Sequence, residues 1–134
     1  MTEFWQCNLE RFNKQKEDWK TTPQDVIDVD IRPLISAINS VESLATQYCC
    51  SGHPRTTDRF NYHGSVVLLI KDLDGLMKVL KFYSALYEDQ SNFSFDNYPG
   101  FNRCFMWFKP REFLYETPED WYKHLNSLGE EIFK

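Results

Sequence analysis

The 134-residue chain has no apolar run near the roughly 20 residues that a membrane-spanning helix needs, and no charged-then-apolar leader at its start. We therefore expect a cytoplasmic protein that makes no membrane contact. A reducing compartment favours free thiols, so the four cysteines are not expected to form a structural disulfide.

Basic residues are also in short supply, because 20 acidic residues outnumber 15 lysines and arginines and leave a formal net charge of −5. Affinity for a phosphate backbone comes mainly from lysine and arginine, so nonspecific binding to nucleic acid is not expected. The chain contains no Walker loop, dinucleotide fingerprint or His-Glu-x-x-His motif. The common nucleotide-hydrolysing and zinc-protease classes therefore lose support.

What the chain does contain is a substantial core, since 42% of its residues are hydrophobic and 16% are aromatic. Its length, without an internal repeat or a low-complexity linker, predicts one domain over residues 1–134. Hydrophobic periodicity and turn residues indicate an α+β fold, a mixed sheet of about four strands packed by about four helices. The expected helices are 3–20, 30–39, 73–88 and 118–132, and the expected strands are 44–50, 65–70, 92–98 and 103–109.

Three residues are expected to cap these helices: Asp30, Asp72 and Thr117. The strand at 65–70 is a continuous apolar run, which is typical of a central strand covered on both faces. With the helix after it, this strand predicts the first half of a β-α-β crossover.

The segment after the first strand concentrates polar chemistry. Cys50 ends that strand, and residues 51–64 hold two of the three histidines together with two arginines. Glycine lets a backbone approach a ligand closely, and hydroxyl, imidazole and guanidinium groups donate hydrogen bonds to phosphate or carboxylate. The sequence therefore predicts a small anionic or nucleotide-like ligand, held by five residues: Ser51, Gly52, His53, Arg55 and Arg59.

The same region resembles the wybutosine-synthesising tRNA methyltransferase family, in which a helix with an Ile-x-Pro-Leu-Ile-x-x-Ile-Asn-Ser pattern leads to a strand that ends in Cys-Ser-Gly. The matching residues are Ile31, Pro33, Leu34, Ile35, Ile38, Asn39, Ser40, Thr46, Cys50, Ser51 and Gly52. The string Cys49-Cys50-Ser51-Gly52-His53 also resembles small uncharacterised phage and bacterial proteins with a Cys-Cys-x-Gly-His motif.

The resemblance to the methyltransferases implies S-adenosylmethionine as a cofactor and a modified nucleoside as the substrate. Ser51 and Gly52 would then lie beside an adenosine-type ligand, with Tyr48, Tyr62 or Trp107 stacking on its base. His53 stands where the family usually has arginine.

Other interpretations of the segment stay open. Cys50 with His53 or His63 offers a nucleophile and a base. A zinc site would need Cys104 to lie beside Cys50, and no Cys-x-x-Cys pair is present, so no metal site is expected. A third interpretation is a non-enzymatic protein that blocks a partner protein through an acidic, aromatic surface, since residues 112–134 carry six acids and two lysines.

Overall fold

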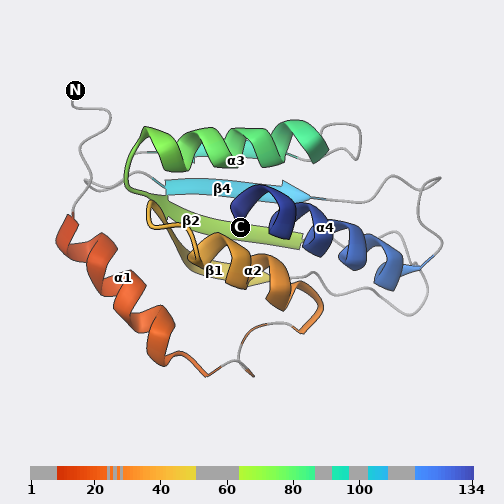
Figure 1. Cartoon of the computed structure of the whole chain (residues 1–134), viewed down its shortest axis with the longest axis horizontal. Coiled ribbons are helices and arrows are strands. Elements are labelled where there is room, and N and C mark those ends of the chain that lie inside the picture. Colours follow the sequence, from red (N-terminus) through yellow and green to blue (C-terminus); the bar gives the residue numbers. More distant parts are fainter. Residues whose placement is uncertain are drawn as a thin grey trace.

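The computed structural model describes residues 9–23, 25, 27, 29–50, 64–86, 92–96, 103–108 and 117–134. These residues form four α-helices, one 3₁₀ turn and four strands (Figure 1). In chain order they are α1 (Leu9–Thr21), η3 (Val29–Ile31), α2 (Arg32–Asn39), β1 (Leu44–Cys50), β2 (Gly64–Ile70), α3 (Leu73–Leu86), β3 (Asn92–Asp96), β4 (Arg103–Phe108) and α4 (Pro118–Phe133). The predicted α+β class and the predicted numbers of strands and helices are confirmed.

The sheet has the strand order β1-β2-β4-β3, and every neighbouring pair is antiparallel. The expected mixed sheet is therefore wrong in its pairing. β2 and β3 do run parallel and are joined through α3, as the predicted crossover requires, but β4 lies between them. The predicted β3-β4 hairpin folds its second strand back into this space, and the parallel strands never become neighbours.

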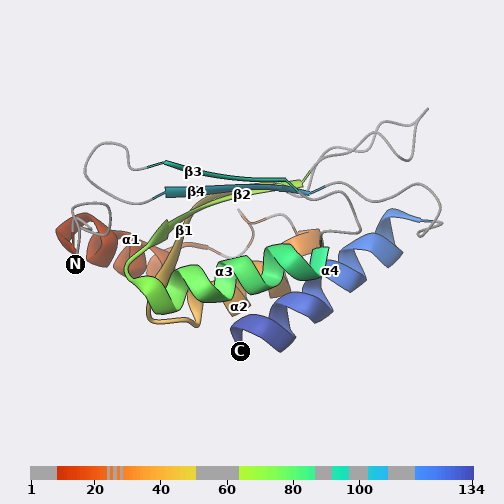
Figure 2. The ribbon, with the colours of Figure 1, turned by 90° about the horizontal axis from the view of Figure 1, so that it is seen from above.

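Three helices cover one face of the sheet. Figure 2 shows α2, α3 and α4 on the same side of the strands. The buried residues of these helices pack against every second residue of the strands, as expected where one face of an antiparallel sheet covers the core. Phe82 of α3 and Phe133 of α4 stack at 5.2 Å between ring centroids in this layer. The fully buried strand residues on this face are Leu44, Val66, Leu68, Ile70 and Cys104.

The opposite face is covered only in part by the helices described. Phe12 of α1 packs there on Ala45 and Leu69 in a second, smaller cluster. Further along β2, Ser65 and Val67 are half-buried. The predicted double coverage of β2 is therefore confirmed at its α1 end.

Two of the three predicted helix caps are confirmed. Asp72 Oδ1 accepts from the Gly75 amide of α3 at 3.2 Å, and Thr117 Oγ1 accepts from the Asp120 amide of α4 at 3.2 Å. Asp30 does not cap α2, because it lies within η3 and the N-cap residue of α2 is Ile31, which has no side-chain cap bond. In place of the third predicted cap, a side chain of another helix bonds to α2, as described below.

α1 is anchored through a lysine. Lys16 Nζ donates to the carbonyls of Asn39 at 2.9 Å and Val41 at 2.7 Å, at the C-terminal end of α2. A cation is favourable there because the helix dipole is negative at that end. Burial lowers the pKa of Lys16 below its ordinary value. Leu9, at the start of α1, is exposed, whereas Phe12 one turn later is buried.

Candidate functional site

The five residues predicted to bind a ligand lie outside the described residues: Ser51, Gly52, His53, Arg55 and Arg59. The structure does describe the two strand ends that flank them in sequence. Cys50 pairs with Ser65, and the next position of β2 is Gly64. The segment between these ends therefore begins and ends at one end of the sheet.

Several other elements begin or end there. Phe108, the last residue of β4, pairs with Gly64, and Asn92, the first residue of β3, pairs with Trp107. Figure 1 shows the C-terminal end of α3 and the start of α4 at the same end of the sheet. Chain segments from four strands thus converge where the polar segment leaves β1.

The backbone register assigns the aromatic residues of this end to rows. Tyr48 pairs with Val67, which pairs with Phe105, and in the next such row Ser65 joins Cys50 to Trp107. These rows alternate with the core row of Val66, so their backbone positions belong to the sheet face opposite α2, α3 and α4. Two of the three residues predicted to stack on a base, Tyr48 and Trp107, therefore have their backbone positions in rows of one face. Tyr62 lies outside the described residues.

A β-bulge sets this arrangement. Thr46 pairs with Leu68 and Tyr48 with Val67, which leaves Gln47 without a partner across the β1-β2 pair. The extra residue reverses the alternation, so Cys49 packs against the core and Cys50 takes a position of the opposite face. The strand sequence contains no glycine or other signal that would have predicted the bulge.

The described thiols do not form the alternative zinc site. Cys104 is fully buried in the core, and β2 separates its strand from β1. Burial raises the pKa of its thiol well above the ordinary range, which keeps it protonated and a poor nucleophile. Cys49 and Cys104 are thiols that take part in no disulfide. No group of three metal-ligating side chains occurs among the residues described.

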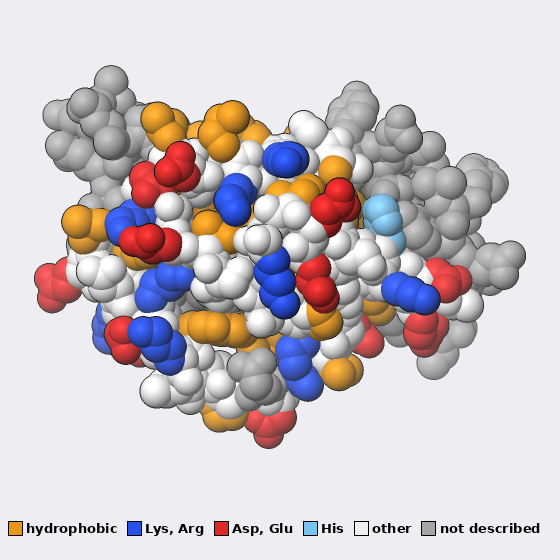
Figure 3. Space-filling view, in the orientation of Figure 1, with side chains coloured by type: hydrophobic (Ala, Val, Ile, Leu, Met, Phe, Trp, Pro, Cys, Tyr) orange, Lys and Arg blue, Asp and Glu red, His pale blue; other side chains and the backbone are white. Residues whose placement is uncertain are grey.

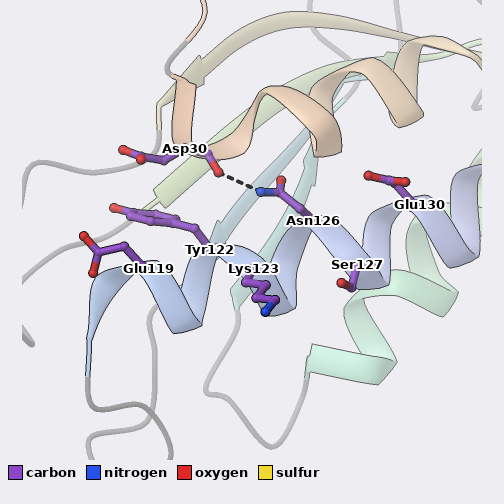
Figure 4. A pocket seen from close by; sticks show the side chains of 7 residues that line it. All are labelled: Asp30, Glu119, Tyr122, Lys123, Asn126, Ser127 and Glu130. Atoms are coloured by element: carbon purple, nitrogen blue, oxygen red, sulfur yellow. Dashed lines mark hydrogen bonds between the residues drawn. The ribbon is translucent and has the colours of Figure 1, made fainter.

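A hollow of about 520 Å³ lies on α4. Figure 4 shows side chains of α4 around it, on the side of the helix that carries Asn126 toward Asp30. Three carboxylates and one lysine line it: Asp30, Glu119, Glu130 and Lys123. On the face drawn in Figure 3, acidic and basic side chains are intermixed over α4.

Asn126, which also lines this hollow, has a structural role that the sequence analysis missed. Its Oδ1 accepts from the Leu34 amide of α2 at 3.1 Å, and its Nδ2 donates to the Asp30 carbonyl at 2.8 Å. It therefore supplies to α2 the cap that Asp30 was expected to provide. A residue 92 positions further along the chain leaves no local pattern that could have revealed this contact.

The chain is similar in fold to the structure of PH1069 protein from Pyrococcus horikoshii, with a TM-score of 0.50. The similarity covers 97% of this chain and 90% of that chain at 15% sequence identity, which shows a shared fold alone. No protein-family model and no curated protein sequence matches the chain. In the part of the chain that the structure describes, no helix has the length and apolar character that crossing a bilayer requires.

Proposed function

We propose that this protein binds a small anionic or nucleotide-like ligand at the sheet end where β1 leads into residues 51–63. The contacts that we assign to the ligand are the five polar residues named above: Ser51, Gly52, His53, Arg55 and Arg59. Arginine and histidine side chains provide charge-assisted hydrogen bonds to an anion, and Gly52 permits close backbone approach.

The observation that supports this proposal most is the register of the sheet at that end. Tyr48 and Trp107 occupy neighbouring rows on one face, with one strand between them. Strands lie about 4.8 Å apart and same-face rows about 6.8 Å apart, so these two positions are roughly 12 Å apart diagonally, which suits a nucleoside lying across β2. Stacking of a base on aromatic rings is a common source of affinity.

The enzymatic alternative is transfer of a methyl group from S-adenosylmethionine to a modified nucleoside. Its support is that the helix and strand before the polar segment resemble a motif of the wybutosine-synthesising tRNA methyltransferase family. It differs from the proposal in requiring two ligands, a methyl donor and a nucleoside acceptor, and in producing S-adenosylhomocysteine.

A second alternative is a protein partner bound through an acidic, aromatic surface. The hollow on α4 favours it, since three carboxylates line it together with Tyr122, against one lysine. The partner that fits this charge is a basic segment.

The test is a thermal-shift and calorimetric comparison of the wild type with the double variant His53→Ala, Arg55→Ala. The ligands are S-adenosylmethionine, S-adenosylhomocysteine, mono- and cyclic nucleotides and pyrophosphate. A ligand present at a hundred times its Kd stabilises the folded state by about 2.7 kcal/mol. We expect at least one of these ligands to stabilise the wild type and to lose that effect in the double variant.

Lys123→Ala is the matched control, because it removes one positive charge from the α4 hollow and none from residues 51–63. Equal stabilisation of the wild type and the double variant would contradict the proposed site. Binding of an oligolysine peptide, abolished by Glu119→Lys and accompanied by no response to any small ligand, would favour the protein-partner alternative.

A further inference from the structure

α3 has a second apolar face, on the side of the helix away from the core. Leu73 is 50% exposed, Met77 63% and Leu80 38%, although all three side chains are large and hydrophobic. Their spacing of four and then three residues places them along one side of the helix. The buried residues of α3 belong to the opposite side: Gly75, Val79, Phe82 and Leu86.

This outward face lies at the edge of the helix layer. α4 contacts both α2 and α3, so α3 is the outer helix on its side of the layer (Figures 1 and 2). A shallow groove of about 450 Å³ runs along it, lined by Met77, Lys78, Leu80, Lys81 and Ser84. Figure 3 shows hydrophobic side chains along the upper edge of the molecule, where α3 lies, with basic side chains beside them. A contiguous apolar patch with a charged rim marks an interaction surface.

The spacing on this face fits a second copy of the same helix. Leu73, Met77, Leu80 and Ser84 follow one another at four, three and four residues, which is the spacing of the a and d positions of a heptad repeat. When two α3 helices meet antiparallel about a twofold axis at the middle of this row, Met77 lies opposite Leu80 of the partner subunit. Leu73 then lies opposite Ser84 of the partner subunit. The symmetry repeats each pair, so every large apolar side chain of the row is covered.

The charges beside the row favour this antiparallel orientation. Asp74 and Lys81 lie on the same flank of α3, seven residues apart, and both are exposed. None of the ion pairs between described residues involves either of them. In the antiparallel arrangement Asp74 faces Lys81 of the partner subunit, and the symmetry forms this contact twice. In a parallel pair these positions stay about 10 Å apart along the helix axis, and no such contact forms.

We propose that this protein forms a homodimer in which the outward face of α3 packs antiparallel against the same face of a second copy. α3 has 14 residues, and a helix of that length measures about 21 Å. A contact between two such helices is at or below the small end of stable interfaces, roughly 1,200 Å². The dimer is therefore reversible, with a Kd on the order of 100 µM. This surface is separate from residues 51–63 and its contact requires no ligand.

The test exchanges the two charges and measures association of the full chain by sedimentation equilibrium. Asp74→Lys gives a flank with two lysines, and Lys81→Asp gives a flank with two aspartates. In each variant both attractive contacts of the dimer become repulsive, so the dimer Kd should rise by about tenfold. An equimolar mixture of the two variants should recover association close to that of the wild type, because the two lysines of one chain then face the two aspartates of the other.

Two further variants complete the experiment. Glu131→Lys, at an exposed position of α4, changes the net charge by the same amount as Asp74→Lys and should leave the dimer Kd unchanged. Met77→Lys places a charge in the middle of the apolar row and should abolish association, while lysine remains a good helix former. Thermal melting followed by circular dichroism verifies that each variant is folded.

A wild type that stays monomeric at about 1 mM, ten times the expected Kd, would overturn the inference and leave this face to a partner of different sequence. A dimer whose Kd is the same in the wild type, Asp74→Lys and Lys81→Asp would also overturn it, because the contact would then lie elsewhere. Failure of the mixture to associate more strongly than either variant alone would contradict the antiparallel pairing. None of these outcomes depends on ligand binding by residues 51–63.

Discussion

Asn126 joins two helices through both ends of one amide. It caps α2 at the Leu34 amide and holds the Asp30 carbonyl just before that helix. Replacing it by leucine removes a cap and a second hydrogen bond, with contributions of about 1 kcal/mol each. We expect Asn126→Leu to lower the free energy of unfolding by about 2 kcal/mol in urea denaturation.

Asn126→Asp keeps the acceptor for the Leu34 amide and loses the donor to the Asp30 carbonyl. Its free energy of unfolding should therefore fall between those of the wild type and Asn126→Leu. Ser127→Ala, at the next and exposed position of α4, is the control and should have little effect. A Leu variant as stable as the wild type would mean that α2 does not depend on this cap.

Cys104 makes stability depend on pH at the alkaline end. Burial raises the pKa of its thiol above the ordinary value of 9.0, so the folded state keeps a proton that the unfolded state releases. The unfolded state then binds fewer protons, and the free energy of unfolding falls as pH rises above 9.0. The loss amounts to about 1.4 kcal/mol at one pH unit above the unfolded value.

Cys104→Val removes the titrating group and approximates its volume, so this variant should lack that part of the alkaline loss. Urea titrations of both proteins at pH 7 and pH 10 measure the difference. Parallel losses in the two proteins would show that another group is responsible.

At the scale of elements, the bulge in β1 determines on which sheet face the backbone positions of Cys49 and Cys50 lie. Gln47 has no partner in β2, and pairing is regular on both sides of it. Deleting Gln47 therefore leaves Tyr48 opposite Val67 and Cys49 opposite Val66. We expect this deletion variant to fold with the native strand pairing.

Deleting Ala45 instead shifts only the first residue of β1 and moves Leu44 from the core face to the other face. It should cost several kcal/mol, as loss of a buried leucine does. Amide hydrogen exchange and urea denaturation of the two deletion variants compare them directly. Equal destabilisation would contradict the assignment of Gln47 as the bulge residue.

The elements that could be predicted from the sequence are those with local causes. Asp72 and Thr117 cap the helices that directly follow them, and both caps were predicted. The cap of α2 could not be predicted, since Asn126 comes from a distant helix. The bulge at Gln47 was missed because β1 carries no local residue that demands one.

At the scale of the whole molecule, the strand order depends on the pairing of β4 with β2, which local sequence propensity does not encode. The β2-α3-β3 crossover was predicted, but β4 lies between the two parallel strands and makes every pairing antiparallel. For the proposed site, the sequence predicts the polar segment after β1 and a stacking ring from Tyr48, Tyr62 or Trp107. That the backbone positions of Tyr48 and Trp107 belong to rows of one face follows only from the register and the bulge.

The most direct test of the account is a map of amide shifts on adding the small ligand that stabilises the wild type most. We predict that the shifts centre on the sheet end formed by Cys50, Gly64, Trp107 and Phe108, and that they vanish in the double variant His53→Ala, Arg55→Ala. Shifts confined to the α4 hollow around Tyr122, and unchanged in the double variant, would contradict the proposed site.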